Sequence, residues 1–126
     1  MKIFNGTPHT LNIIEGSTYD PTMRKYVGGK VVRQIPSNRP MSLHVVSEQT
    51  GNIDGILVFT KKVLGMNWLP YGYDIYIVSL VFARAHGQTP ENNIYVPTDI
   101  VVTPDGRTIL GCRGIQLYKE MKYDEQ

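Results

Sequence analysis

The sequence predicts an α+β fold that is mainly antiparallel β-sheet, with one or two short helices. Its apolar runs are short and rich in Val, Ile and Tyr, and 12 glycines and 8 prolines divide them at close intervals. This pattern is typical of strands joined by turns. The chain has 126 residues and an apolar content of 41%, which suits one domain with its own core. We expect a single domain over residues 1–126, with residues 119–126 as a charged tail that frays.

The first half of the chain is expected to hold strands separated by turns and one long loop. Residues 15–30, which contain Pro21, Gly28 and Gly29 and show no clean period, are expected to form a long, partly ordered loop. The segment 48–52 is expected to be the turn of a hairpin between the fourth and fifth strands. The strands expected in this half are residues 2–4, 10–14, 31–35, 41–47 and 56–63.

The second half is expected to contain the helix. Residues 74–78 are mostly apolar, as in a strand that is buried on both faces. Ser79 stands where a helix N-cap is expected and Gly87 where a helix ends, which predicts a short helix over residues 80–86. A polar loop follows at 88–93, and a turn built on Pro and Gly is expected at 103–107. The remaining strands are expected at residues 94–96, 100–102, 108–112 and 114–118.

Charge and composition exclude several classes of partner. The 13 basic and 11 acidic residues are mixed along the chain and leave a formal charge of +2, too even a balance for a nucleic-acid polymer or a membrane surface. No apolar run approaches the ~20 residues that span a bilayer, and the start lacks the layout of a signal peptide. We therefore expect a cytosolic protein. A small anion held by a few arginines is compatible with this charge.

The residues that carry chemistry form no recognisable catalytic or metal set. His9, His44 and His86 are scattered, without the spacing of a metal-binding pair. Cys112 is the only cysteine, so a disulfide within the chain is impossible, and a small buried strand residue is favoured over a nucleophile that lacks a visible base. We expect a protein that binds a ligand without transforming it, with no metal and no cofactor.

Four residues near the predicted helix are candidates for ligand contact. Phe82 and Arg84 are two apart and therefore face different sides of a helix; Phe82 is favoured as a core residue, and the alternative is a stacking platform for a nucleobase. Asn92 and Asn93 either form a turn or offer amides to a base edge or a sugar hydroxyl.

Basic and aromatic residues elsewhere add further candidates. Arg113, in the run Gly111-Cys112-Arg113-Gly114, is suited to hold a phosphate through two parallel hydrogen bonds. Arg24, in the long early loop, either adds charge to that site or is simply solvated. Four aromatic residues are expected to form either an assembly surface or part of the core: Trp68, Tyr71, Tyr73 and Tyr76.

Three stretches in this order resemble a known family. They are Asn5-Gly6-Thr7-Pro8-His9, then residues 75–84 (Ile-Tyr-Ile-Val-Ser-Leu-Val-Phe-Ala-Arg), then residues 105–114 (Asp-Gly-Arg-Thr-Ile-Leu-Gly-Cys-Arg-Gly). Small phage and prophage proteins of the anti-Thoeris sponge family are similar in all three. The resemblance runs from near residue 1 to near residue 118, and its motifs cover about a quarter of the chain.

The resemblance implies a nucleotide sponge that acts in the cytoplasm of the bacterial host. Such sponges bind glycocyclic ADP-ribose, the signal made by bacterial TIR-domain enzymes, and hold it without degrading it. Family members form dimers that can assemble into hexamers, with the signal bound between subunits, and some hold cyclic trinucleotides of the CBASS system at a separate site. The residues that the resemblance assigns to the signal are Phe82, Asn92 or Asn93, Arg113 and Arg24, and those it assigns to a second site are Arg84 and Arg107.

Two other functions remain open on the sequence. One is a phosphodiesterase or nucleotide hydrolase that acts on the same signals. The other is a structural phage protein without a ligand, in which Phe82, Asn92 and Arg113 all serve the fold.

Overall fold

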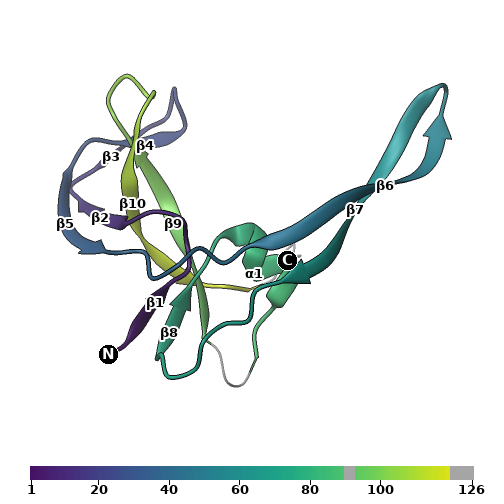
Figure 1. Cartoon of the computed structure of the whole chain (residues 1–126). Helices are drawn as coiled ribbons and strands as arrows, with labels where there is room; N and C mark the ends of the chain where they lie inside the picture. The colour runs from purple at the N-terminus through teal and green to yellow at the C-terminus, as the bar shows by residue number, and fades with distance from the viewer. Residues whose placement is uncertain (90–92, 120–126) are drawn as a thin grey trace, which may run out of the picture.

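The computed structural model describes residues 1–89 and 93–119, which form a curved mixed sheet, one helix and a long two-stranded arm (Figure 1). Within these residues the expectation of a small, mainly β domain with a short helix is confirmed. The elements in chain order are β1 (Ile3–Asn5), β2 (Leu11–Glu15), β3 (Thr18–Asp20), β4 (Lys25–Val27), β5 (Lys30–Ile35), β6 (Leu43–Ile53), β7 (Ile56–Met66), β8 (Ile75–Ile77), α1 (Leu80–His86), β9 (Ile94–Val102) and β10 (Ile109–Leu117).

The main sheet is centred on β9. Its strand order is β1-β8-β9-β10-β2-β5, and β4 also pairs with β9. Since β10 occupies one edge of β9, strands β8 and β4 share the other: β8 pairs at Ile94 and Tyr95, and β4 pairs at Val101 and Val102. The sheet was predicted to be mainly antiparallel, but it is mixed. Four of its strand pairs are parallel, namely β1–β8, β8–β9, β4–β9 and β2–β10. The antiparallel ladders are the longer ones.

Several predicted boundaries differ from the observed ones. The segment 15–30 is not a loop, because it folds into the β3–β4 hairpin, in which Tyr19 lies opposite Tyr26. Its turn is closed by Asp20, whose side chain accepts hydrogen bonds from the backbone N–H groups of Thr22 and Met23. The four short strands expected at the C-terminal end are two long ones, β9 and β10. The tail residues 120–126 lie outside the described residues.

The helix matches its prediction at both ends. Ser79 is the N-cap, and its side chain accepts a hydrogen bond from the backbone N–H of Phe82 at 3.2 Å. Gly87 ends the helix at a φ of 71°, a conformation that favours glycine. Among the described residues no helix is long and apolar enough to cross a membrane.

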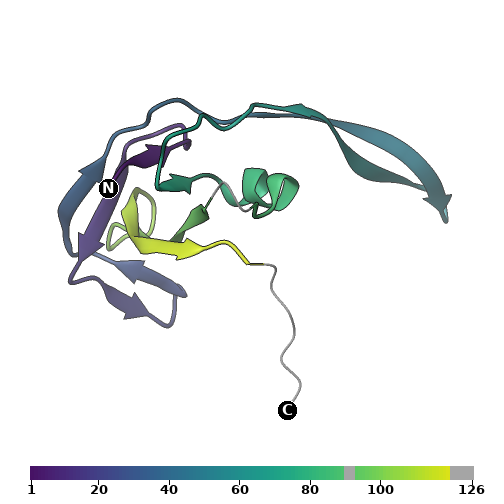
Figure 2. The same ribbon diagram turned by 90° about the horizontal axis from the view of Figure 1, so that it is seen from below.

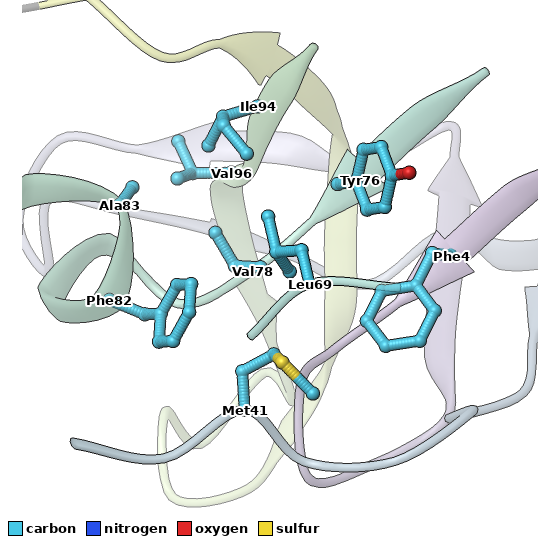
Figure 3. Packing of buried hydrophobic residues seen from close by; sticks show 9 residues of the cluster. All are labelled: Phe4, Met41, Leu69, Tyr76, Val78, Phe82, Ala83, Ile94 and Val96. Carbon is cyan, nitrogen blue, oxygen red and sulfur yellow. The ribbon is translucent and has the colours of Figure 1, made fainter. Parts of the chain in front are cut away.

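Two apolar clusters occupy the two faces of the sheet. Tyr76 on β8 and Val78, which directly follows β8, belong to the cluster beside α1, whereas Ile77 between them belongs to the opposite cluster, as alternation along an extended chain requires. The cluster beside α1 consists of nine buried residues, which are Phe4, Met41, Leu69, Tyr76, Val78, Phe82, Ala83, Ile94 and Val96 (Figure 3). The opposite cluster is built on Leu11, Ile77 and Cys112.

Strands β6 and β7 form an arm that extends away from the main sheet (Figures 1 and 2). The two strands pair only with each other. The turn is not at residues 48–52, as expected, but at Asp54 and Gly55, where positive φ values of 52° and 81° are those of a two-residue hairpin turn. The predicted turn segment lies inside β6 because Asp-Gly is the stronger turn signal.

Candidate functional site

Arg113 lies on β10 directly after the buried Cys112. Because successive strand residues point to opposite faces, burial of Cys112 leaves the Arg113 side chain on the outer surface. It faces Asp99 on β9, and its Nη1 donates a hydrogen bond to Asp99 Oδ2 at 3.2 Å. Both side chains are more than 40% exposed, so this ion pair contributes at most about 1 kcal/mol. An incoming anion can therefore replace Asp99 at a small cost in free energy.

Tyr26 supplies an aromatic surface for Arg113. The guanidinium carbon lies 4.4 Å from the centre of the Tyr26 ring, which is cation–π geometry. Tyr26 is brought there by the parallel pairing of β4 with β9, in which it lies beside Val101. Tyr19 meets the Tyr26 ring edge-on, with ring centres 5.1 Å apart. Tyr26 thus supports the guanidinium, and the Arg113 side chain stays 46% exposed, with N–H donors beyond the one given to Asp99.

A pocket of about 430 Å³ opens beside Arg113. This volume is within the usual range for sites that hold small molecules. The other lining residues come from the end of β2 and the bend that follows it, namely Ile14, Glu15, Gly16 and Ser17. Glu15 is the acidic member of this lining, so the pocket is not uniformly basic, and Arg113 is the cation that lines it.

Arg24 and Arg107 lie on neighbouring turns. A Cβ placed on Gly106 would be 2.9 Å from Met23 Sδ, so the turn before β4 touches the turn between β9 and β10, and both appear together at the top of Figure 1. Arg24 and Arg107 are the next residues along these two turns, and both are exposed. Arg24 has a positive φ of 56°, a conformation that costs a non-glycine residue about 1–2 kcal/mol.

The structure places Phe82 in the core and not at the ligand site. Its side chain is 1% exposed, within the cluster beside α1 (Figure 3), and its ring stacks on His86 with centres 5.8 Å apart. Phe82 belongs to the same cluster as Ile94 at the start of β9, whereas Arg113 faces Asp99, roughly 16 Å further along a strand that rises about 3.3 Å per residue. Stacking on a nucleobase is therefore wrong for Phe82 in this conformation, because both ring faces are covered by protein.

Asn93 and Arg84 are both separated from Arg113. Asn93 donates a hydrogen bond from Nδ2 to the carbonyl oxygen of Asp74 at 3.2 Å, at the end of the sheet where β9 begins. Arg84 is exposed on α1. Asn92 lies outside the described residues.

Two of the three resembling motifs have structural roles in this fold. Asn5 is fully buried, and its side chain holds the turn after β1. Its Nδ2 donates to the carbonyl oxygens of His9 and Ile35, and its Oδ1 accepts from the N–H and the hydroxyl of Thr7. Gly111 lies so close to β2 that a Cβ there would be 2.2 Å from the carbonyl oxygen of Asn12. The backbone of β2 therefore occupies the space beside Gly111.

Cys112 is a buried thiol. Its side chain is fully buried, and burial raises its pKa above the ordinary value, which disfavours the thiolate. This confirms the interpretation of Cys112 as a small buried strand residue. Over residues 1–89 and 93–119, no group of three or more His, Cys, Asp or Glu side chains is placed to hold a metal ion.

Tyr26, Tyr19 and Asp99 are the site residues that sequence reasoning missed. The sequence carried a weak strand signal at the tyrosines, because tyrosine favours strands. Tyr19 and Tyr26 are each the central residue of a three-residue strand, β3 and β4. Runs of that length are too short for a periodicity to emerge. Asp99 carried no such signal, since only the pairing of β9 with β10 places it opposite Arg113.

Neither a protein-family model, nor a curated protein, nor a solved structure matches this chain.

Proposed function

We propose that this protein is a phage anti-defence sponge, which sequesters the TIR-derived signal glycocyclic ADP-ribose in the cytoplasm of the bacterial host and does not degrade it. The observation that carries the proposal is the exposed Arg113 guanidinium, stacked on Tyr26 beside a pocket of about 430 Å³. The identity of the ligand follows from the family resemblance of the three motifs.

The chemistry of the site suits a nucleotide diphosphate. A planar guanidinium holds phosphate oxygens through parallel hydrogen bonds, and its restraint on Tyr26 reduces the entropy lost on binding. Tyr26 takes the aromatic role that the resemblance assigned to Phe82, since its ring lies against Arg113, and Tyr19 packs against the Tyr26 ring. Arg24, on the turn that leads into β4, adds positive charge from the same hairpin.

A second copy of the chain completes the pocket in this proposal. In one chain the pocket opens to solvent, and a sponge that competes for nanomolar signal needs about −12 kcal/mol of binding free energy. Enclosure between subunits of a dimer, or of a hexamer assembled from dimers, removes more of the ligand surface from water. Asn92 or Asn93 then contributes to the signal site from the partner, and Arg84 and Arg107 serve the second site, for cyclic trinucleotides.

Retention of intact ligand is the decisive test. The protein is incubated with glycocyclic ADP-ribose and passed through a filter that retains protein, and the retained fraction is then heated and its nucleotide identified by mass spectrometry. We expect intact ligand to be released only after heating. Degraded ligand would show a hydrolase, and unretained ligand would show a protein without this function.

Matched arginine variants then locate the site. Arg113→Ala is expected to abolish retention, whereas Arg33→Ala, which removes an exposed arginine of β5 outside the pocket lining, is expected to retain the ligand as the unchanged protein does. Equal retention by both variants, at unchanged thermal stability, would move the site away from Arg113.

A further inference from the structure

Glu15 is the acidic residue in the pocket that Arg113 lines, and its carboxylate is not used by the fold. Over residues 1–89 and 93–119, no hydrogen bond or ion pair reaches the Glu15 side chain, although Lys30 lies opposite it in the β2–β5 ladder. The ion pair in this part of the chain joins Arg113 to Asp99. An ionised carboxylate only accepts hydrogen bonds. Glu15 therefore keeps its acceptor sites for a group that enters the pocket.

The bend that follows Glu15 is fixed by close backbone packing. A Cβ placed on Gly29 would be 2.5 Å from the carbonyl oxygen of Glu15 and 2.9 Å from the backbone nitrogen of Ser17. Gly29 and Gly16 have φ values of 91° and 78°, which favour glycine. Gly28, beside Gly29, donates a backbone hydrogen bond of 3.1 Å to the end of β9. The bend is therefore held in place before a ligand arrives.

A β-bulge lies directly before Glu15. The β2–β5 register shifts between Ile13 and Ile14, so that β5 carries one extra residue there, Val32. Bulges redirect the side chains beside them and are frequent next to functional sites. Consecutive residues of a regular strand point to opposite faces, yet Ile14 and Glu15 both line the pocket. The irregular ladder thus brings the Glu15 carboxylate to the same pocket as Arg113.

A carboxylate and a guanidinium in one pocket restrict what the pocket holds. Arg113 attracts a phosphate, whereas Glu15 repels it and accepts hydrogen bonds only from a donor. A ligand that satisfies both residues therefore carries a phosphate and, beside it, a group with N–H or O–H donors. The two adjacent hydroxyls of a ribose meet this requirement without adding charge, and dinucleotide-binding folds hold a ribose hydroxyl with an acidic residue for the same reason. The Ser17 hydroxyl, in the same lining, is a further partner for a sugar.

We infer that Glu15 recognises the ribose of the bound nucleotide, by accepting hydrogen bonds from its two adjacent hydroxyls while Arg113 holds the neighbouring phosphate. The inference rests on the proposed function and adds to it a selectivity for the sugar. A ribose with both hydroxyls free is bound in preference to a deoxyribose, which leaves the carboxylate without a donor. A ribose that carries an extra phosphate is rejected, because that phosphate meets the Glu15 charge.

Inorganic pyrophosphate and ADP separate recognition of the ribose from a general effect on the pocket. Glu15→Gln keeps the size of the side chain and removes its charge. The variant is expected to bind pyrophosphate several-fold more tightly, because a like charge is lost. The ratio of ADP affinity to pyrophosphate affinity is expected to fall about tenfold, because hydrogen bonds to a charged group are replaced by weaker neutral ones. Isothermal titration calorimetry measures both ligands, and an unchanged ratio overturns the inference.

A matched carboxylate elsewhere provides the control. Glu48→Gln removes an exposed glutamate of β6, outside the pocket lining, and is expected to leave both affinities as they are in the unchanged protein. Because Glu15 is also exposed, both variants are expected to unfold at the urea concentration of the unchanged protein. A fall of the affinity ratio in Glu48→Gln as large as in Glu15→Gln would overturn the assignment to Glu15.

Dideoxy-ADP, in which hydrogen replaces both ribose hydroxyls, tests the hydroxyls directly. The unchanged protein is expected to bind ADP about tenfold more tightly than dideoxy-ADP, and Glu15→Gln is expected to reduce this preference to about twofold. A preference that Glu15→Gln leaves unchanged overturns the inference. IDP, which lacks the amino group of adenine, tests the other donor of the nucleotide. A preference for ADP over IDP that depends on Glu15, without one over dideoxy-ADP, would assign the carboxylate to the base and overturn the ribose contact.

Retention of glycocyclic ADP-ribose keeps failure of this inference distinct from failure of the proposed function. Retention by the unchanged protein, together with an ADP preference that does not depend on Glu15, would leave the sponge proposal standing and show that the ribose contact is wrong. A Glu15-dependent preference for ADP in a protein that retains no glycocyclic ADP-ribose would support the ribose contact and overturn the proposed function. A protein that binds none of these ligands would overturn both.

Discussion

The guanidinium carbon of Arg113 lies 4.4 Å from the centre of the Tyr26 ring. The two residues come from distant parts of the chain, and the parallel pairing of β4 with β9 brings them together. The same guanidinium holds Asp99 through a single exposed hydrogen bond. An arginine that is oriented by an aromatic ring and weakly paired with a carboxylate is prepared to exchange that carboxylate for another anion. The first two predictions follow from this arrangement.

Tyr26→Leu is expected to weaken retention of glycocyclic ADP-ribose roughly 5- to 30-fold, because it removes the ring that orients Arg113, a contact worth about 1–2 kcal/mol. Tyr26→Phe keeps the aromatic face and is expected to change retention less than about threefold. Isothermal titration calorimetry measures both. Equal effects of Leu and Phe would contradict the role of the ring.

Asp99→Asn is expected to tighten binding of inorganic pyrophosphate several-fold, because it removes the carboxylate that competes for Arg113. Asparagine tolerates the positive φ of 56° at this position. Asp54→Asn is the matched control, since Asp54 has a φ of 52° at the tip of the arm, outside the site. Calorimetric titration that gives the same affinity for both variants would show that Asp99 does not compete with the anion.

Asn5→Ala is expected to lower the free energy of unfolding by about 2–4 kcal/mol, because four side-chain hydrogen bonds are lost in a buried site. Asn52→Ala removes one exposed bond at the arm turn and is expected to cost less than about 1 kcal/mol. Urea unfolding followed by circular dichroism measures the difference. An effect of Asn5→Ala as small as that of Asn52→Ala would mean that the turn after β1 is held by other contacts.

Gly111→Ala is expected to destabilise the protein by about 2–4 kcal/mol, because the new methyl group would collide with the backbone of β2, 2.2 Å away. Gly114→Ala, three residues along the same strand, meets no atom within 4 Å and is expected to be nearly neutral. Urea unfolding of the two variants provides the comparison. Comparable stability of the two would show that β10 and β2 separate easily at this point.

Cys112 is expected to react slowly with a thiol reagent at pH 8 in the folded protein and rapidly in denaturant. Burial raises the pKa of this thiol, so the folded state keeps its proton at a pH where the unfolded chain loses it. The folded state therefore binds more protons than the unfolded state above the ordinary thiol pKa of about 8.5, and stability falls as pH rises through that value. Reactivity and urea midpoints between pH 7 and 10 test both statements. Fast labelling of the folded protein would show that β10 opens.

The sequence by itself determined the elements whose signals are local. The helix from Leu80 to His86 was predicted to the residue, because Ser79 and Gly87 act within one turn of its ends. Its two faces followed from the same geometry, with Phe82 buried and Arg84 exposed. Arg113 was a candidate phosphate ligand from its place in the run Gly111-Cys112-Arg113-Gly114, and it is exposed in the structure beside the buried Cys112.

Only the tertiary structure decided which of these residues meet. Strand pairing joins segments that are remote in the chain, and its free energy arises from packing and hydrogen bonds that no short window of sequence contains. Thus β4, a strand of three residues inside an expected loop, places Tyr26 beside Arg113. The same long-range packing buries Phe82, which the family resemblance assigned to the ligand, and leaves the arm residue Phe59 exposed.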